Sequence, residues 1–423
     1  MPRTRKKTSK KEAKYLKRIK RRQALRDFLN GISLRENSDR TINICVFLLM
    51  CFGTAMIASV AVGATKSSIM TVIKAIVKQI SFLLASYICI VSANKIITLK
   101  RVWRLRAMLL LIFVALMIIP FAFPAIGGSH AWIQLPIGVT FQPSEFGKPL
   151  IILFTASAVF AAIRKRKMQE SFWKMFSFPL IAYGITLILL VLQKDFGTLM
   201  IISGIFYFCL MVPSYPKIQK VQRIATTLLV VGALSAGLLF FVSDIGVNML
   251  KQTPLAHIAT RIENMKNPFN DIYGNGYQPA NSLYGIADSN IFGKGFGNSS
   301  RKYGYLTQAD NDYILAVTIE ETGIFGLGFI LLMYTLIEYR LFYYALRTRD
   351  VPKKIILIGT GAYLFMHFAL NVGGVGALIP MTGIPLLYIS SGGSSILAIS
   401  LTIGVAQQCI SRIREQEMKG EFK

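Results

Sequence analysis

The segment Arg261–Asp312 reads RIENMKNPFNDIYGNGYQPANSLYGIADSNIFGKGFGNSSRKYGYLTQADND and is polar and rich in glycine. Apolar runs long enough to cross a bilayer lie on both sides of it. Membrane chains seldom carry such a loop for packing alone, because a polar loop is where water, an acidic side chain and a polar substrate can meet at a membrane surface. The segment therefore predicts a bundle of spanning helices with one large functional loop.

The composition supports the same class. Of the 423 residues, 53% are hydrophobic and only 16% are charged, and the mean hydropathy is +0.50. These values are typical of an all-α polytopic membrane protein. Ten apolar stretches are predicted to span the membrane, centred near residues 42–64, 76–98, 107–125, 146–163, 178–193, 197–213, 224–243, 312–336, 355–373 and 394–411. The polar loop at 244–311 then lies between the seventh and eighth helices.

The basic residues predict the orientation, because Lys and Arg are retained on the cytoplasmic side during insertion. Basic clusters alternate with loops that hold few or no basic residues, and they lie at 95–106, 164–167, 217–223, 340–354 and 412–423. An even number of helices places both termini in the cytoplasm and the loop at 244–311 outside. The loop itself carries mixed charges, so its side follows from the alternation.

Three regions are predicted along the chain. Residues 1–40 hold about 15 Lys or Arg and form a basic cytoplasmic tail, which we expect to be partly disordered or to place an amphipathic helix at 10–32 on the anionic inner leaflet. Nucleic-acid binding is disfavoured, because no nucleic-acid-reading module accompanies the tail. Residues 41–411 form the membrane domain, and residues 412–423 form a second cytoplasmic tail.

Cysteine and histidine give no sign of a disulfide framework, a zinc site or a histidine-based catalytic centre. All five cysteines lie in or at the end of predicted spanning helices, and the three histidines are far apart in the sequence.

Four segments could carry chemistry, and each also has a purely structural interpretation. At the start of the fourth helix, Ser144 suits an N-cap, and Glu145 and Lys148 suit a local i,i+3 ion pair. A carboxylate and an ammonium at the outer interface nevertheless cost free energy unless they line a wet cavity or bind something polar.

The other three segments are also ambiguous. Residues 193–198 (QKDFGT) suit a simple hairpin as well as a site. The Gly- and Pro-rich residues 371–395 cannot face lipid with unsatisfied amides, so they must pack against protein or line a cavity. Asp271, in the polar loop, suits a turn residue that caps its own backbone as well as a catalytic acid.

Taken together, these segments resemble the SEDS family (shape, elongation, division and sporulation), whose members include the division protein FtsW and the elongation protein RodA. The resemblance covers most of residues 42–411 and rests on six motifs in the same order. They are Trp132-Ile133 with Phe141–Glu145 and Lys148, Gln193–Thr198, Asn267-Pro268 with Asp271, Gly274 and Gly276–Gln278, Gly293–Ser299 with Lys302, Asn311-Asp312 with Glu320–Gly323, and Pro380–Pro385 with Ser390–Ser395.

The resemblance implies a peptidoglycan polymerase that joins lipid II disaccharides into glycan strands at the outer face of the bacterial cytoplasmic membrane, by inverting glycosyl transfer with a lipid pyrophosphate as leaving group. The attacking sugar hydroxyl needs a base, and the leaving group needs cations. The resemblance assigns the base to Asp271 and implies a divalent cation, Mg²⁺ or Mn²⁺, without identifying its ligands. It also assigns positioning or substrate binding to Glu145, Lys148 and Gln278, with Asp195 and Asp312 as second-tier acids. From their charge, Arg261, Lys294 and Lys302 are candidates for the pyrophosphate or for loop ordering.

The resemblance further implies a partner, a class B penicillin-binding protein whose spanning helix packs near the eighth and ninth helices, within division or elongation machinery. Small residues that would allow close helix approach there are Gly323, Gly326, Gly328, Gly359 and Gly361. Small residues also pack helices within one chain, so this support is weak.

The chain departs from the family pattern in several places. Ala131 stands where the family usually has Arg, so a phosphate contact there is lost or moved, and residues 281–282, 288–290 and 306–312 also differ. Asp271 is retained, and the long basic tail favours the division type over the elongation type. Two other functions remain open, a flippase for lipid-linked precursors and a non-catalytic scaffold for the division machinery.

Overall fold

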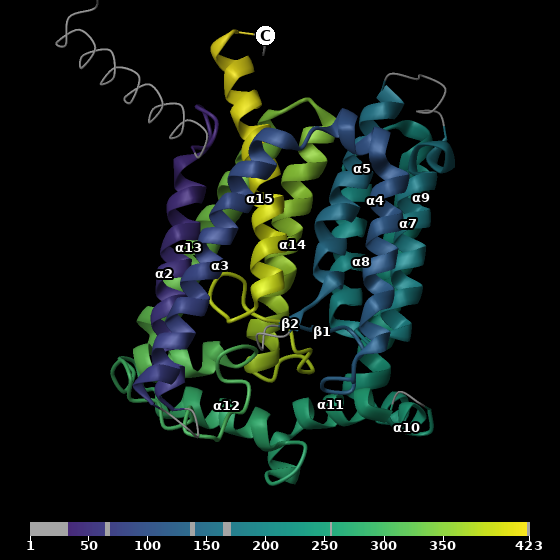
Figure 1. The fold of residues 1–423 in the computed structure, drawn as a ribbon. Coiled ribbons are helices and arrows are strands. Elements are labelled where there is room, and N and C mark those ends of the chain that lie inside the picture. The colour runs from purple at the N-terminus through teal and green to yellow at the C-terminus, as the bar shows by residue number, and fades with distance from the viewer. Residues whose placement is uncertain (1–32, 64–67, 136–139, 164–170, 254–255, 421–423) are drawn as a thin grey trace, which may run out of the picture.

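The computed structural model describes residues 33–63, 68–135, 140–163, 171–253 and 256–420. The amphipathic helix predicted at 10–32 lies outside these described residues. Helices dominate the fold (Figure 1) and follow in this order: α2 (Arg40–Val62), α3 (Ile69–Ile96), α4 (Leu99–Ile118), η1 (Ile119–Ala122), η2 (Pro143–Phe146), α5 (Gly147–Ile163), α7 (Phe172–Leu192), α8 (Phe196–Met211), α9 (Pro216–Gly237), η3 (Leu238–Val242), α10 (Ile245–Lys251), α11 (Ala256–Lys266), η4 (Pro268–Asp271), α12 (Tyr277–Asp288), α13 (Ile314–Arg347), α14 (Val351–Val375) and α15 (Gly393–Met418). A two-stranded antiparallel hairpin pairs β1 (Ile133–Gln134) with β2 (Thr140–Phe141).

All ten predicted spanning segments are helical. Within the described residues, nine helices are long and apolar enough to cross a bilayer. The predicted segment at 197–213 forms α8, which has only 16 residues and is shorter than the roughly 20 residues that a spanning helix needs. The all-α polytopic fold class is therefore confirmed.

Local sequence sets where several helices begin. The side chains of Asp39, Ser68, Thr98, Asp195 and Asp350 each accept a hydrogen bond from a backbone amide in the first turn of the helix that follows. Such caps satisfy amides that have no partner within the helix. Polar residues between the apolar runs therefore begin helices as well as separate them.

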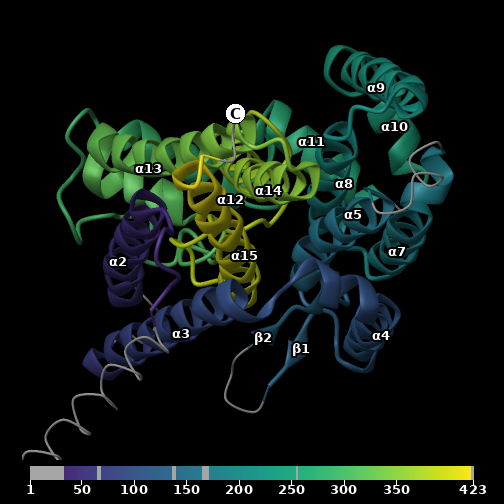
Figure 2. The same cartoon turned by 90° about the horizontal axis from the view of Figure 1, so that it is seen from above.

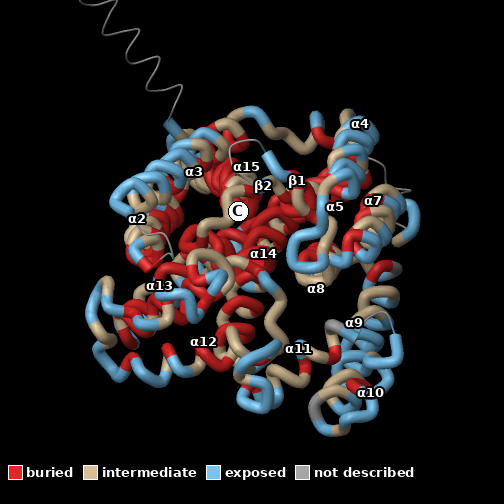
Figure 3. Tube along the Cα trace, turned by 60° about the horizontal axis from the view of Figure 1, so that its bottom comes forward, coloured by how far each residue is buried: buried red, intermediate tan, exposed pale blue. Residues whose placement is uncertain are grey.

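The centre of the bundle is formed by α5, α14 and α15, which are the most buried helices (Figure 3). Viewed along the bundle, α15 lies between α3 and the pair formed by α13 and α14 (Figure 2). Gly404 lets α15 approach α3 closely, because a Cβ atom there would lie 2.4 Å from the carbonyl oxygen of Ile90. In contrast, most of the apolar stretch of α9 is exposed or only partly buried, and this helix stands at the edge of the bundle (Figure 3).

The two ends of the bundle differ. The beginning of α2 and the end of α15 lie at one end, and α10, α11 and α12 lie at the other (Figure 1). The predicted loop at 244–311 is therefore partly helical and covers the end opposite the beginning of α2 and the end of α15. This arrangement agrees with the predicted alternation, while the side of the membrane that each end faces stays a prediction.

The segment between α14 and α15 returns through the protein interior. Leu386, Leu387, Tyr388 and Ile389 are at most 1% exposed, and the hydroxyl of Tyr334 donates to the carbonyl of Leu387 at 2.7 Å. Both expectations for this glycine- and proline-rich backbone are confirmed, because residues 386–389 pack against protein and residues 391–395 line a cavity.

Candidate functional site

The start of the fourth predicted helix is held by the segment at 193–198. Asp195 caps α8 through the amide of Thr198 at 3.1 Å, and its other oxygen accepts from Gln142 Nε2 at 2.9 Å and Ser144 Oγ at 3.1 Å. The two motifs thus form one unit, in which Asp195 positions η2.

Glu145 and Lys148 lie side by side in the interior. Lys148 Nζ is 2.6 Å from Glu145 Oε1 and 2.9 Å from His367 Nε2, and the hydroxyl of Tyr363 donates to Glu145 Oε2 at 3.4 Å. Lys148 is 0% exposed and Glu145 is 3% exposed. The predicted i,i+3 ion pair is present, and both charges have partners inside the protein. These contacts support a structural role for the ion pair.

His367 is a residue that the sequence did not predict for this cluster. It lies one turn after Tyr363 on α14, and its Nδ1 is 3.2 Å from the carbonyl of Pro385. Because Lys148 is 219 residues away in the sequence, only the position of His367 inside an apolar helix could have drawn attention to it.

Asp310 and Asp312, at the end of the polar loop, accept hydrogen bonds from α14 and from the return segment between α14 and α15. Asn371 Nδ2 donates to the carbonyls of Asp312 at 3.0 Å and Ile384 at 2.8 Å, and Ser391 Oγ donates to Asp310 Oδ2 at 2.8 Å. The end of the loop is thus fixed against the return segment at the loop end of the bundle.

Polar atoms without partners gather at this junction. Within the described residues, 11 buried side-chain oxygen or nitrogen atoms have no hydrogen-bond partner. Four of them belong to these two neighbouring segments, namely Asn311 Oδ1, Asp312 Oδ1, Asn371 Oδ1 and Thr382 Oγ1. Each such atom costs about 1–3 kcal/mol when left unsatisfied, so their gathering indicates a place that receives a polar ligand or water.

Asp312 is the acid at this junction. The pKa of Asp312 is raised to about 6, mainly by burial and also by the neighbouring Asp310, while Arg261 opposes the rise. Arg261 reaches the same place from α11, since its Nη1 donates to the carbonyl of Met381 at 3.1 Å. A carboxylate that titrates near neutral pH beside an arginine is a feature typical of catalytic sites.

A cavity of about 170 Å³ opens next to this junction. Asp310 and Asn311 line it from the loop, Ser391 and Ser394 line it from the return segment, and the side chain of Lys78 reaches it from α3. Lys78 was not among the predicted site residues, although a lysine within an apolar run of α3 was a signal for it. The cavity thus combines a cation, a carboxylate and several hydroxyl groups.

Asp271 lies in a different environment. It is exposed, and its Oδ2 accepts from the amide of Asn275 at 2.8 Å. The turn closes tightly around it, because a Cβ atom on Gly274 would lie 2.3 Å from the same oxygen. The structure thus shows Asp271 capping its own turn, which was its structural interpretation from the sequence.

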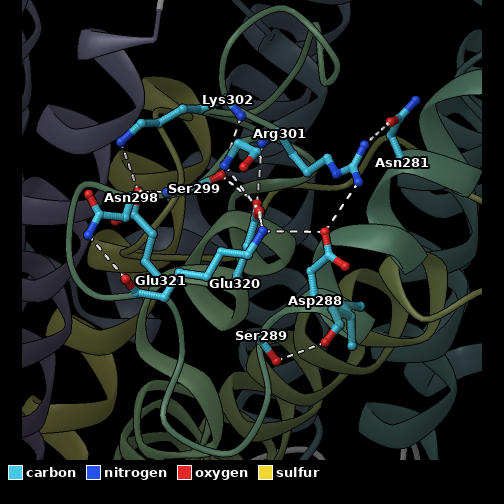
Figure 4. A network of polar contacts seen from close by, with 12 residues as sticks. Asn281, Asp288, Ser289, Asn298, Ser299, Arg301, Lys302, Glu320 and Glu321 are labelled. Atoms are coloured by element: carbon cyan, nitrogen blue, oxygen red, sulfur yellow. Dashed lines mark hydrogen bonds and ion pairs between the residues drawn. The ribbon is translucent and has the colours of Figure 1, made fainter.

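Two lysines of the polar loop, Lys294 and Lys302, pair with two glutamates of α13. Figure 4 shows Lys302 with Glu320 and Glu321. Lys294 Nζ lies 2.9 Å from Glu320 Oε1, and Lys302 Nζ lies 3.0 Å from Glu321 Oε1. The side chains of Lys302 and Glu321 are both 0% exposed. Between the two proposed roles for these lysines, the contacts therefore favour loop ordering over pyrophosphate binding.

The loop is fixed to α13 at a kink. Gly323 has φ of 59°, and a Cβ atom there would lie 2.2 Å from the carbonyl oxygen of Ile291. Gln278 adds a further attachment within the loop, since its Nε2 donates to Thr307 Oγ1 at 2.7 Å. These contacts hold the segment that leads into Asp310 and Asp312.

The glycines proposed for partner contact fall into two groups. Gly323, Gly326, Gly359 and Gly361 are buried within this chain, and a Cβ on Gly359 would lie 2.8 Å from the sulfur of Cys209. The space above Gly328 is open. Gly323, Gly326 and Gly359 thus serve the packing of this chain.

This part of the protein offers few ligands for a divalent cation. Within the described part of the chain, no group of three His, Cys, Asp or Glu side chains could hold a metal ion. Mg²⁺, however, commonly takes only one or two protein carboxylates and completes its shell with phosphate oxygens and water. Asp310 beside Asp312 fits that smaller requirement.

Comparisons with known proteins identify the family. The family described as "Cell cycle protein", which comprises FtsW, RodA and SpoVE, matches residues 39–416. The chain is 32% identical over 300 residues to a probable peptidoglycan glycosyltransferase FtsW of Enterococcus hirae, covering 70% of this chain and 71% of that one. It is 29% identical to its Bacillus subtilis counterpart, covering 90% and 92%.

Solved structures agree with the fold. A chain of a peptidoglycan synthase complex matches with a TM-score of 0.64 at 21% identity, covering 90% of this chain and 99% of that chain. RodA of Thermus thermophilus matches with a TM-score of 0.56 at 19% identity, covering 90% and 98%. The motifs, the ten helices and the family match agree, and the chain belongs to the SEDS family of FtsW, RodA and SpoVE cell cycle proteins.

Proposed function

We propose that this protein is a peptidoglycan glycosyltransferase that polymerises lipid II at the membrane surface covered by its polar loop. The relatives that share its family are peptidoglycan glycosyltransferases by name. The observation that carries the proposal is the gathering of four unpartnered buried polar atoms around Asp312, beside Arg261 and a polar cavity.

The attacking sugar hydroxyl of an inverting glycosyl transfer must lose its proton to a general base. Asp312 supports this role best, because its pKa of about 6 and its free Oδ1 leave it able to accept a proton near neutral pH. Asp271, the base that the resemblance implies, already accepts a backbone hydrogen bond within its turn. Asp312 therefore replaces Asp271 as our proposed base, and Asp271 becomes a residue that shapes the loop.

The departing pyrophosphate gains negative charge, which must be met by cations. Arg261, which donates to the carbonyl of Met381 at the junction, and Lys78, which lines the cavity, support this role among the described residues. A divalent cation, when bound, would neutralise further charge on the phosphates, and Asp310 would hold it from the protein side. Lys294 and Lys302 act indirectly, by fixing the loop.

The surroundings of the enzyme are part of the proposal. It is a multi-pass membrane protein, and we place both termini in the cytoplasm, with the loop at 244–311 outside. A class B penicillin-binding protein would crosslink the new strands. The division role is favoured over the elongation role, because FtsW-named relatives match up to 90% of this chain.

The experiment that tests the function is polymerisation of purified lipid II by the purified protein with its penicillin-binding protein partner and Mg²⁺ or Mn²⁺. We expect glycan strands, and chelation of the cation should stop their growth. Movement of labelled lipid II across vesicles without strand formation would instead support a flippase. Neither polymerisation nor transport, in a protein that restores division when supplied to depleted cells, would support a scaffold.

The dependence of the rate on pH tests the base. Below its pKa, Asp312 is protonated and cannot accept the proton of the sugar hydroxyl. We expect kcat/KM to rise with pH with a midpoint of about 6. This parameter reports the pKa of a base in the free enzyme. Asp310→Asn removes a neighbouring negative charge and should move the midpoint to lower pH, whatever its effect on the rate. A midpoint that does not move would contradict the assignment.

A further inference from the structure

Four large apolar side chains are exposed where the polar loop meets the kink of α13. Ile291 and Phe292 of the loop are 64% and 75% exposed, and Ile324 and Phe325 of α13 are 60% and 62% exposed. The rings of Phe292 and Phe325 stack with their centroids 5.7 Å apart. We call these four side chains the Phe292 surface. Exposed apolar side chains that gather in this way mark a contact with a partner or with lipid.

The backbone holds the Phe292 surface in place. The amide of Ile324 donates to the carbonyl of Ile291 at 3.0 Å. Gly293 has φ of 76° and allows the loop to approach closely, because a Cβ atom there would lie 2.3 Å from the carbonyl oxygen of Glu321. The loop is thus fixed to the kink, and Phe292 is held at the same depth as this part of α13.

Two contacts between α2 and α13 indicate how deep this part of α13 lies. Arg340 pairs with Asp39 at the end of the bundle where α2 begins, and Ser59 donates to Glu321 at 2.7 Å toward the loop end. On both helices the two contacts are about 20 residues apart, a rise of about 30 Å, which matches the roughly 30 Å thickness of a hydrocarbon core. Because charged groups are costly at the centre of a bilayer, these contacts mark its two boundaries.

The Phe292 surface lies on the bilayer side of the nearer boundary. Ile324 and Phe325 follow Glu321 by about one turn in the direction of Arg340, which places them roughly 5 Å inside the hydrocarbon. The ring of Phe292, stacked on Phe325, is at the same depth. Exposed apolar side chains at this depth are covered by lipid, and their transfer out of water is favourable.

We propose that the Phe292 surface is a lipid anchor, which inserts residues 291–292 of the polar loop into the leaflet on the loop side of the membrane. Its binding partner is the upper part of the acyl chains, directly below the headgroups. Because the loop is fixed to α13 beside the Phe292 surface, the anchor sets the height of the loop above the bilayer. The proposal does not depend on the glycosyl-transfer chemistry, because it rests on exposure and depth alone.

The test measures the depth of residue 292 in phosphatidylcholine vesicles. Phe292→Trp is made in the full chain after the native tryptophans have been replaced by phenylalanine, so that its fluorescence reports one position. We expect phospholipids brominated in the upper part of their acyl chains to remove most of this fluorescence, and iodide in the water to remove little. Thermal unfolding followed by circular dichroism shows that the variant is folded.

Two matched variants calibrate the depth. Leu332, two turns further along α13, is 53% exposed, and Leu332→Trp should be quenched most strongly by lipids brominated near the ends of their acyl chains. Tyr273, in the turn after η4, is 91% exposed, and Tyr273→Trp should be quenched by iodide. Phe292→Trp should lie between these two.

A second measurement tests whether lipid contact holds the loop. The amides of Lys294 and Gly295 donate to the carbonyls of Glu320 and Glu321, so their hydrogen exchange reports the attachment of the loop to α13. In vesicles we expect Phe292→Ser to speed this exchange at least about tenfold, because the loop loses its apolar anchor. Phe292→Leu stays apolar and should change the exchange little.

Several outcomes would overturn the proposal. Quenching of Phe292→Trp by iodide and not by brominated lipid would place the ring in water. Quenching by neither would assign the Phe292 surface to a contact between copies of this chain. Lipid quenching that disappears when the penicillin-binding protein is added would assign it to that partner. Equal exchange in Phe292→Ser and Phe292→Leu would show that lipid contact does not hold the loop.

Discussion

Asp312→Asn is expected to lower the rate of lipid II polymerisation by about 10²–10⁴-fold, the range typical of losing a general base. The substitution keeps the size of the side chain and removes its ability to accept the proton of the sugar hydroxyl. Because Asp312 Oδ1 has no hydrogen-bond partner among the described residues, the amide should cost little stability. Polymerisation of purified lipid II, followed as strand formation over time, measures the effect.

Asp271→Asn is the matched control for this prediction. An asparagine can cap the same turn, since its side-chain oxygen also accepts from a backbone amide. We expect this variant to keep a rate within about tenfold of wild type, a modest effect of a loosened loop. If Asp271→Asn abolishes polymerisation and Asp312→Asn does not, the sequence-based assignment is correct and our proposed base is wrong.

Lys148→Met is expected to destabilise the protein by about 3–5 kcal/mol, because it leaves the buried carboxylate of Glu145 without its charge partner. His367 would lose its 2.9 Å contact with Lys148 Nζ in the same step. The shift in thermal unfolding of the detergent-solubilised protein, followed by circular dichroism, gives the magnitude. The loss should appear as lower folded yield as well as a lower midpoint.

Two controls define the cause of that loss. Glu145→Gln combined with Lys148→Met removes both charges and should recover much of the stability. Lys251→Met breaks an ion pair with Glu263 whose side chains are 48% and 43% exposed, and it should change stability by no more than about 1 kcal/mol. A double variant as unstable as Lys148→Met alone would show that packing, and not the unpaired charge, causes the loss.

The sequence predicted the apolar helices but not the polar helices of the loop. The ten apolar runs predicted ten helices, and all ten are present, because a chain in hydrocarbon must satisfy its backbone hydrogen bonds within each helix. The short loop helices α10, α11 and α12 were not predicted, since polar helices at a surface leave a weaker pattern.

The candidate site was only partly predictable. The pair Glu145 and Lys148 could be predicted because its members are three residues apart on one helix. His367 and Asn371 join the site from α14, and no local pattern connects them to Lys148 and Asp312, which lie 219 and 59 positions away. Lys78 likewise reaches the cavity only because α3 packs beside α15.

By itself, the sequence determined the membrane class, the positions of the ten apolar helices, the family and the set of acidic candidates. Only the tertiary structure distinguished those acids, because Asp271 caps an exposed turn while Asp312 is enclosed between the loop and the return segment. The pKa of a carboxyl group depends on its burial and on neighbouring charges. Those quantities arise from contacts between distant segments, which exist only once the chain has folded.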